Sequence, residues 1–369
     1  MVGYGTQGAV IRGQLVCCQQ MGITNNQTYK KESIMILRHQ EKERQRRKRV
    51  RFLVCEPPPH MRAGGGKHGN MLAKRAQRGG GINPRKTAHG WARFMRRLMG
   101  EFDAELVVIP APPPPLYDTV FPRDTYFVGP DGKIHRAKMV ADYRRSDPFY
   151  ICAHLQALGL EVVDDLNHVM EGRSCFHVLP NETAIIYCPG ARAEPKAADD
   201  LRRIFGVEVL VVELVHEFFF HADVAGMALS GREPAVFWCR ESLARPDDWD
   251  LIRDACRYDK STFVQASKED ALRYAMNTRV MNGYQVIAPP GMSVKYVRDV
   301  NALGYEVHMI DLGPLHTGCG GFISCTTNDF PDSFYKQRVP EQNRGENALT
   351  RFEQAIASYP RREMVLGQI

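Results

Sequence analysis

The chain has 369 residues, of which 44% are hydrophobic and 25% charged, with ten cysteines and a formal net charge of +7. This length favours one large domain with appendages, and no apolar run reaches the roughly 18 residues that a membrane span needs. The first residues also lack the apolar stretch of a signal peptide, so we expect a cytoplasmic protein without a membrane partner. The cysteines and histidines show no paired zinc pattern, which predicts that there is no metal site.

The charge is unevenly distributed along the chain. Residues 1–100 contain 21 Lys and Arg against 4 Asp and Glu, which leaves 28 against 38 for the remainder. The basic run at 41–49 predicts that residues 1–48 form a disordered or short helical extension. Weak contact of residues 1–49 with nucleic acid is the alternative, because a basic arm on an acidic body is typical of nucleic-acid-binding tails.

The predicted elements begin with a strand at residues 50–55, which the prolines at 57–59 end. A helix follows from 84 to about 102, with Trp91, Phe94, Met95 and Leu98 as its apolar stripe. Short hairpins and helices then alternate, which predicts an α/β chain with mixed sheets. The hairpins are expected at about 125–140, 175–188 and 222–239; the helices near 146–158, 195–205, 247–257, 268–276 and 292–303; and further strands at 106–109, 160–163, 207–213, 262–266, 284–288 and 305–311.

One candidate nucleophile follows a pair of glycines. Gly320 and Gly321 let the backbone approach a ligand closely, and Cys325 can present its sulfur at the end of that turn. Cys319, six residues earlier, is the rival. A cysteine becomes reactive when positive charge stabilises its thiolate, and a cationic substrate could supply that charge.

A candidate acid/base pair lies at His221 and Asp223. On a strand, residues two apart point to the same face, so the imidazole and the carboxylate could share a pocket. Histidine titrates near neutrality and can protonate a departing amine. The alternative is that His221 is an ordinary core histidine, because it follows the aromatic run 218–220.

Three further carboxylates could act on a cation. Glu171 could orient the histidine or hold the substrate. Asp118 and Asp124 flank a loop stiffened by a proline and containing an aromatic residue, which suits bidentate hydrogen bonding to a planar cation. An N-cap or Asx-turn role is the alternative for both aspartates.

Taken in this order, the segments resemble the guanidine-modifying (pentein) superfamily, which includes arginine deiminase, agmatine deiminase, dimethylarginine dimethylaminohydrolase and the glycine amidinotransferases. The loop 118–125 looks like the family's D-x-V-F-x-x-D motif with its R-D pair, here Arg123 and Asp124. Glu171-Gly172 looks like the start of E-G-G-D, the segment 221–223 like H-x-D, and the segment 320–325 like the G-G-x-x-x-C turn. This alignment selects Cys325 over Cys319. The helix at 269–277 resembles the family's helix that leads to an asparagine.

The resemblance implies a five-bladed α/β propeller of ββαβ units around a central pocket, over residues 49–335, with residues 336–369 as a C-terminal tail or helix. It implies that Asp124 and Glu171 orient a guanidinium, that Cys325 attacks its carbon, and that His221 protonates the leaving amine. By the same resemblance, Asp223 holds a substrate nitrogen or the histidine, and Asp118 and Arg123 belong to the substrate-binding loop. The expected partner is a small guanidine substrate, and no cofactor or metal is implied.

The sequence departs from the family pattern after Glu171. Arg173 stands in the motif, and the motif's aspartate is absent. If Arg173 faced the pocket, it would repel a cationic substrate. Three hypotheses therefore stay open: a hydrolase of an arginine-like or methylarginine-like guanidine, an amidinotransferase with an amine as acceptor, and an inactive scaffold whose basic arm binds nucleic acid.

Overall fold

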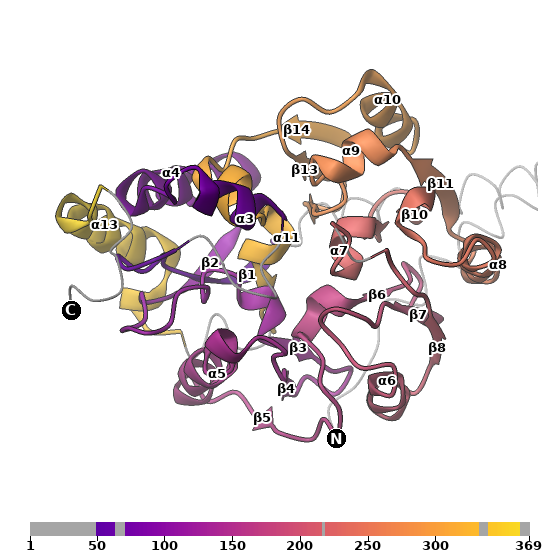
Figure 1. The fold of residues 1–369 in the computed structure, drawn as a ribbon, viewed down its shortest axis with the longest axis horizontal. Helices are drawn as coiled ribbons and strands as arrows, with labels where there is room; N and C mark the ends of the chain where they lie inside the picture. The colour runs from indigo at the N-terminus through magenta and orange to yellow at the C-terminus, as the bar shows by residue number, and fades with distance from the viewer. Residues whose placement is uncertain (1–48, 63–70, 216–217, 332–338, 362–369) are drawn as a thin grey trace, which may run out of the picture. The chain divides into compact units, whose positions relative to one another are not determined.

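The computed structural model describes residues 49–62, 71–215, 218–331 and 339–361. The predicted extension at 1–48 lies outside the described residues. The described strands form five sheets of three strands each, arranged in a ring around one centre (Figure 1). In every sheet the middle strand has one antiparallel and one parallel neighbour. A parallel pair needs a crossover connection, and a helix provides it each time. The predicted five-bladed α/β propeller is confirmed.

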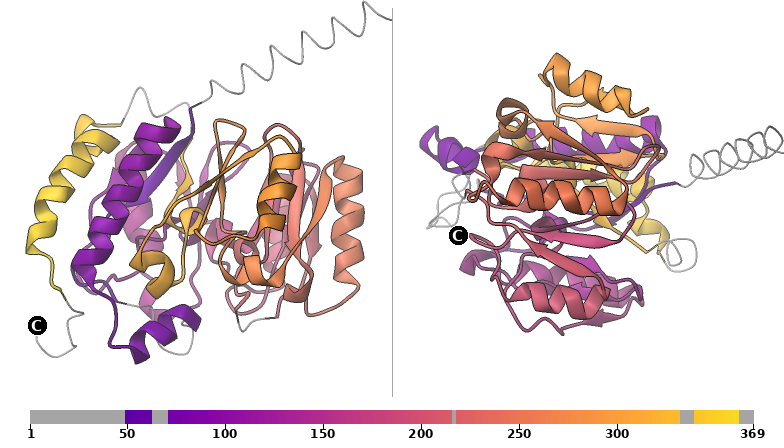
Figure 2. Two further views of the ribbon diagram at one scale, coloured as in Figure 1. Left: turned by 90° about the horizontal axis from the view of Figure 1, so that it is seen from above. Right: turned by 90° about the vertical axis from the view of Figure 1, so that its right-hand side faces the viewer.

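Four blades are continuous in sequence. Each has the order strand, strand, helix, strand, and its helix lies on the outside of the ring (Figure 2). These blades are β3 (Tyr126–Val128), β4 (Ile134–Arg136), α5 (Asp147–Ala157) and β5 (Val162–Val163); β6 (Phe176–Val178), β7 (Ala184–Tyr187), α6 (Ala197–Phe205) and β8 (Glu208–Val211); β9 (Gly226–Leu229), β10 (Ala235–Cys239), α8 (Asp248–Asp259) and β11 (Thr262–Ala266); and β12 (Arg279–Met281), β13 (Gln285–Ala288), α10 (Val294–Ala302) and β14 (Glu306–Met309).

The remaining blade joins the two ends of the domain. Strand β1 (Arg51–Cys55) is parallel to β2 (Glu105–Ile109) and antiparallel to β15 (Asn328–Asp329), with Phe52 opposite Asp329. Helices α3 (Met71–Arg78) and α4 (Pro84–Phe102) connect β1 to β2. Since β15 comes from the far end of the chain, its pairing with β1 closes the ring.

Helix α13 (Gly345–Ala355) packs on the outside of this first blade. The rings of Trp91 on α4 and Phe352 on α13 meet edge to face at 5.1 Å between centroids. At the surface, Arg96 pairs with Glu353 at 2.9 Å. Part of the C-terminal segment therefore contributes to the core of the first blade.

The burial of the strands explains why they form. The middle strands β7, β10 and β13 are buried along their whole length, as expected for strands covered on both faces. Helix α4 begins where Asn83 caps the backbone N–H of Lys86 at 2.8 Å, with Pro84 at the first helical position. The predicted helix at 84–102 is confirmed.

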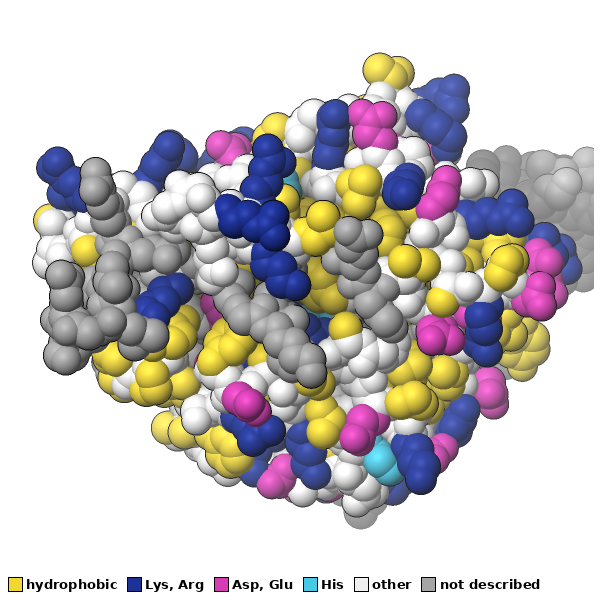
Figure 3. All heavy atoms as spheres, viewed as in Figure 1, with side chains coloured by type: hydrophobic (Ala, Val, Ile, Leu, Met, Phe, Trp, Pro, Cys, Tyr) yellow, Lys and Arg dark blue, Asp and Glu magenta, His cyan; other side chains and the backbone are white. Residues whose placement is uncertain are grey.

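Some of the excess positive charge of the first 100 residues lies on a folded element. Helix α3 contains Lys74, Arg75 and Arg78, and Lys and Arg side chains gather over this helix in the space-filling view (Figure 3). Over the rest of that face, acidic and basic side chains are interspersed.

A short helical turn precedes the first strand of each blade. Four of the turns are η1 (Pro122–Asp124), η3 (Gly172–Cys175), α7 (Ala222–Ala225) and α11 (Ile323–Thr326). The fifth follows α9 (Lys268–Leu272) and ends near residue 277. Successive turns contact one another, from α11 to η1, η3, α7 and α9. The turns therefore form an inner ring, and the predicted strand character at 222–225 is wrong.

Candidate active site

The inner ring gathers polar side chains from all five blades. Glu171 and His221 lie 50 residues apart in sequence, and Asn277 and Cys325 lie 48 apart, yet the members of each pair are in hydrogen-bonding contact. A spacing of about 50 residues matches one blade. Side chains at equivalent places in successive blades therefore meet at the centre of the fold.

The sulfur of Cys325 is held by Asn277. The Asn277 side-chain amide lies with its nitrogen 3.0 Å from Cys325 Sγ, and its oxygen accepts the Cys325 backbone N–H at 3.2 Å. Burial, together with the charges of Asp223 and Asp124, raises the pKa of the Cys325 thiol well above its usual value. These surroundings therefore favour the protonated thiol over the thiolate at neutral pH.

The turn before Cys325 requires its glycines. Gly320 has φ of +75°, in the left-handed region that glycine adopts without strain. A Cβ on Gly321 would lie 2.4 Å from Cε1 of Phe121, closer than any real contact. The glycine pair thus lets the cysteine turn pack directly against the loop that contains Asp118 and Asp124.

Replacing Asn277 with alanine is expected to loosen this turn. The Asn277 oxygen also accepts the backbone N–H of Phe322, at 3.1 Å, so the substitution leaves two buried N–H groups without a partner. We expect a loss of about 2 kcal/mol or more in the free energy of unfolding, and slower alkylation of Cys325 by a guanidine-like probe. Denaturant unfolding and timed mass spectrometry would measure the two effects. Unchanged alkylation in a folded protein would contradict the positioning role.

His221 lies at the start of α7, not on a strand. Its Nε2 is 3.2 Å from Glu171 Oε2, and its Nδ1 is 3.9 Å from Asp124 Oδ1. The expectation that His221 and Asp223 share one face of a strand is wrong, because residues 222–225 form a helical turn. The buried imidazole therefore lies between two carboxylates, within hydrogen-bonding distance of Glu171.

Glu171 is fully buried, and its carboxylate contacts the His221 imidazole. Its carboxylate pairs with Arg192 Nη1 at 2.9 Å and accepts the backbone N–H of Val140 at 3.2 Å. Burial raises the pKa of Glu171, but Arg192 and His221 together lower it below its usual value. The lowered pKa keeps Glu171 charged between Arg192 and His221. The sequence analysis did not single out Arg192, because nothing around it marks it as part of a site.

Asp124 is engaged by Arg144 as well as by its own neighbours. Arg144 Nη1 lies 2.6 Å from Asp124 Oδ2, and the Ser174 hydroxyl donates to Oδ1. The same guanidinium pairs with Asp147 at 2.9 Å and lies 4.0 Å from the Asp118 carboxylate. Arg144 thus shows that these carboxylates can bind a guanidinium. Sequence reasoning missed it, since the segment 142–145 looks like an ordinary charged loop.

A pocket of about 30 Å³ lies inside this cluster. Four of the predicted site residues line it, namely Asp118, Asp124, His221 and Cys325, and so does the rival cysteine. The rival is Cys319, and the other lining residues are Phe121, Tyr143, Arg144, Arg192, Phe220 and Gly320. Both acidic and basic side chains line it, so its wall offers partners for a cationic group and for an anionic group.

Two predicted substrate ligands lie elsewhere. Arg123 lines a second, larger cavity and is absent from the wall of this pocket, so its assignment to the substrate stays a prediction. Asp223 lies behind the cysteine turn, where it accepts the Ser324 hydroxyl at 2.9 Å and approaches Arg123 Nε at 3.6 Å. Its Oδ2 is also 3.8 Å from Cys325 Sγ.

Arg173 also points away from the catalytic pocket. Its Nη1 donates to the carbonyl of Phe176, and its guanidinium lies 4.6 Å from the centre of the Phe176 ring. It lines the larger cavity, as Arg123 does. The repulsion of a cationic substrate that the sequence suggested therefore does not arise from Arg173 in the catalytic pocket.

Within the described part of the chain, no cluster of three or more His, Cys, Asp or Glu residues could hold a metal ion. No described helix is long and apolar enough to cross a membrane.

The sequence of this chain matches a known protein family and a curated relative. The family described as "N,N dimethylarginine dimethylhydrolase, eukaryotic" matches residues 82–328, which is more than half of the chain and includes Cys325. The chain belongs to this family. A curated relative, the N(G),N(G)-dimethylarginine dimethylaminohydrolase of Mycobacterium tuberculosis, is 26% identical over 161 residues. That match spans 43% of this chain and about half, 49%, of the relative.

Solved structures of other proteins share the fold of this chain. The N-terminal domain of ArgZ, an arginine dihydrolase from cyanobacteria, is 17% identical, with a TM-score of 0.65. The match covers 76% of this chain and 97% of that domain. A dimethylarginine dimethylaminohydrolase, solved as its adduct with 4-chloro-2-hydroxymethylpyridine, is 18% identical with a TM-score of 0.55, covering 77% of this chain and 100% of that one.

Proposed function

We propose that this protein hydrolyses a small guanidino compound of the arginine or methylarginine type through a covalent adduct on Cys325. The observation that carries the proposal is that Cys325, His221 and Asp124 line one pocket, with Glu171 holding the histidine. This set supplies a nucleophile, a proton donor and a guanidinium anchor. Family membership and the names of the relatives, a dimethylarginine dimethylaminohydrolase and an arginine dihydrolase, support the same reaction class.

Substrate binding creates the thiolate in this proposal. The Cys325 pKa is raised by burial and by two carboxylates, so a guanidinium placed against Asp124 would offset those charges and lower that pKa. To reach Asp124, the substrate displaces or shares the contact with Arg144. Arg144 and Arg192, which both line the pocket, would then face a carboxylate at the other end of an amino-acid substrate.

The reaction takes two steps. The Cys325 thiolate forms a C–S bond to the guanidinium carbon. The C–N bond to the departing amine breaks as that nitrogen takes a proton from His221, which leaves a planar thiouronium cation. A water molecule then gives a proton to His221 and forms a C–O bond, the C–S bond breaks, and the remaining hydroxyl proton passes to solvent as the ureido C=O forms. The products are an amine and a ureido compound, with the thiolate and the protonated histidine restored.

The test is intact-protein mass spectrometry after incubation with a panel of guanidines, including arginine and dimethylarginine, and with a chloroacetamidine probe. We expect a covalent label on Cys325 and release of a ureido product from at least one guanidine. Labelling of no cysteine and turnover of no member of the panel would contradict the proposal. The amidinotransferase hypothesis predicts a different outcome, because arginine with glycine would then yield ornithine in place of citrulline.

No observation favours the inactive scaffold. Its strongest support was Arg173, which points out of the catalytic pocket, and the proposed nucleic-acid arm lies outside the described residues. Retention of the full chain on RNA or DNA that is sensitive to salt, and that is lost when residues 1–49 are deleted, would revive that part of the hypothesis.

A further inference from the structure

A second cavity lies on the other side of the inner ring. It has a volume of about 580 Å³, within the range typical of small-molecule sites. None of its lining residues lines the catalytic pocket. The two spaces share the same turns, however. Arg123 faces the cavity while Asp124 faces the pocket, and Ser324 faces the cavity while Cys325 faces the pocket.

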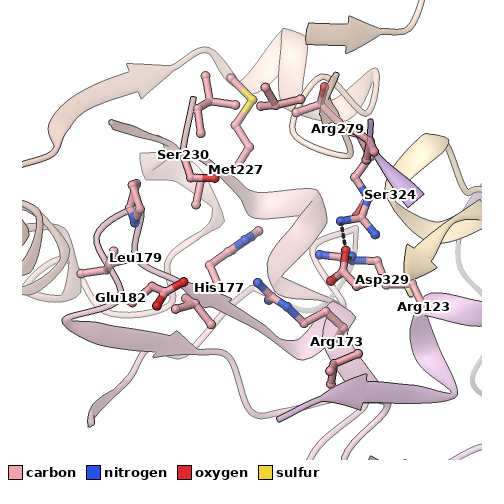
Figure 4. A pocket seen from close by; sticks show the side chains of 18 of the residues that line it. Arg123, Arg173, His177, Leu179, Glu182, Met227, Ser230, Arg279, Ser324 and Asp329 are labelled. Carbon is pink, nitrogen blue, oxygen red and sulfur yellow. Dashed lines mark hydrogen bonds and ion pairs between the residues drawn. The ribbon is translucent and has the colours of Figure 1, made fainter. Parts of the chain in front are cut away.

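Three arginines point into this cavity. They come from three different blades, with Arg123 on η1, Arg173 on η3 and Arg279 at the start of β12. Their guanidinium groups converge on one region of the cavity, where Asp329 also lies (Figure 4). A second acid, Glu182, lines the cavity but is exposed to solvent.

The acidic groups nearby do not balance these arginines. Asp329 is 3.0 Å from Arg279 and 4.0 Å from Arg123, and Asp223 is 3.6 Å from Arg123. Among the described residues, no carboxylate lies within 4.0 Å of Arg173. Two buried or half-buried carboxylates therefore serve three guanidinium groups, which leaves an excess of positive charge in a space with restricted access to water.

Some hydrogen-bond donors in the cavity wall lack an acceptor among the described residues. Arg123 is only 4% exposed, and its Nε and Nη1 have no hydrogen-bond partner in the part of the chain that the structure describes. His177 is 6% exposed, and its Nε2 likewise has no described partner. Leaving buried donors without an acceptor costs free energy. An acceptor that enters the cavity would remove that cost.

The pKa values of two of the arginines are lowered, as expected where positive charges lie close together. Burial and the charge of Arg123 lower the pKa of Arg173 to about 9 and that of Arg279 to about 10. Burial and the charge of Arg173 lower the pKa of His177 to about 3, so this imidazole is neutral. A bound anion would reverse the lowering of both arginine pKa values.

We propose that this cavity is a binding site for a small multivalent oxyanion, held by Arg123, Arg173 and Arg279. Guanidinium groups match the geometry of phosphate and carboxylate oxygens through paired N–H donors. A phosphate ester and a polycarboxylate share this chemistry, and a volume of about 580 Å³ admits either. The site is separate from the proposed hydrolytic pocket and does not depend on the reaction in that pocket.

The site has a short route to the catalytic sulfur. Arg123 contacts Asp223, which lies 3.8 Å from Cys325 Sγ. An anion that draws Arg123 away from Asp223 would leave that carboxylate less neutralised beside the thiol. We therefore expect bound anion to slow alkylation of Cys325, because the thiolate becomes harder to form.

The experiment is calorimetric titration of the full chain at low salt with inorganic phosphate, a nucleoside monophosphate and citrate. Wild-type protein is expected to bind at least one of these probes saturably at one site. Arg173→Gln is expected to weaken that binding by about tenfold or more, since it removes one guanidinium without breaking a described ion pair. The matched control is Arg253→Gln on the outer helix α8, where Arg253 pairs at the surface with Asp250, and it should leave binding unchanged.

Two further variants keep the result interpretable. Ser230 is an exposed residue of the cavity wall, so Ser230→Asp adds a negative charge with little risk to folding and should also weaken binding. Cys325→Ser should bind the anion as the wild type does, which separates this site from the hydrolytic one. Saturable binding that Arg173→Gln and Ser230→Asp leave unchanged, or no saturable binding of any of the three probes, would overturn the proposal.

Discussion

Replacement of Cys325 with serine is expected to lower turnover of the accepted guanidine by about three orders of magnitude or more. The proposed reaction needs a sulfur that becomes an anion when a cation binds, and a serine hydroxyl does not ionise under the same influence. Serine preserves the approximate size of the side chain, and the Cys325 backbone N–H keeps its bond to Asn277. The measurement is the rate of ureido product formation, with circular dichroism to show that the variant is folded.

Cys319 provides the matched control, because it is buried and lines the same pocket. Cys319→Ser is expected to retain most of the activity, since the structure places Asn277 against the sulfur of Cys325. The opposite pattern, with activity lost in Cys319→Ser and retained in Cys325→Ser, would mean that the nucleophile has been assigned to the wrong cysteine.

Glu171→Gln is expected to have the second largest effect. The carboxylate contacts both His221 and Arg192, so its loss removes the charge that stabilises a protonated imidazole. We expect kcat to fall by about a hundredfold, and the limb of the pH–rate profile that requires protonated His221 to move to lower pH. A purely structural role would lower activity without moving that limb.

The same substitution should change how stability depends on pH. The pKa of Glu171 is lowered in the folded protein because Arg192 and His221 outweigh burial. The charged carboxylate therefore stabilises the fold above the pKa it has in the unfolded chain, and this contribution is lost as the pH falls toward the folded value. Wild type and Glu171→Gln should differ by about 3 kcal/mol in the free energy of unfolding at neutral pH, and the difference should shrink in acid.

The control for this measurement is Glu353→Gln. Glu353 forms a solvent-exposed pair with Arg96, so its loss should change the free energy of unfolding by only about 0.5 kcal/mol. Denaturant unfolding of the three proteins across a range of acidic and neutral pH would show the effect. A difference between wild type and Glu171→Gln that stays constant with pH would contradict the account of the buried pair.

Periodic apolar patterns predicted the longer elements well. Helix α4 has a proline at its first position, an asparagine cap and a buried stripe that includes Trp91 and Leu98, and each of these features is visible in the residue order. The short strands β12 and β15 were not predicted, because two or three residues are too few to show an alternating pattern. They form because β13 and β1 offer edges on which they can pair.

The roughly fifty-residue spacing of the site residues was present in the sequence but was not recognised as a repeat. Glu171 and His221 differ in type, and so do Asn277 and Cys325. Equivalent positions in successive blades are therefore occupied by different residue types, so the repeat cannot be aligned by sequence identity. Only the recurring hairpin and crossover helix reveals the period, and it does so at the level of architecture.

The sequence alone determined the alternation of strands and helices, the motif residues Asp124, Glu171, His221 and Cys325, and the choice of Cys325 over Cys319. The alternation follows from local pattern, whereas the motif residues and the choice between the two cysteines follow from the resemblance to the pentein superfamily. The tertiary structure decided which way each side chain of an inner turn points, and so which residues of a motif belong to which space. Arg123 and Asp124 are adjacent in the chain but face different cavities, because a tight helical turn at the centre of the ring sends consecutive side chains to opposite sides of the inner wall.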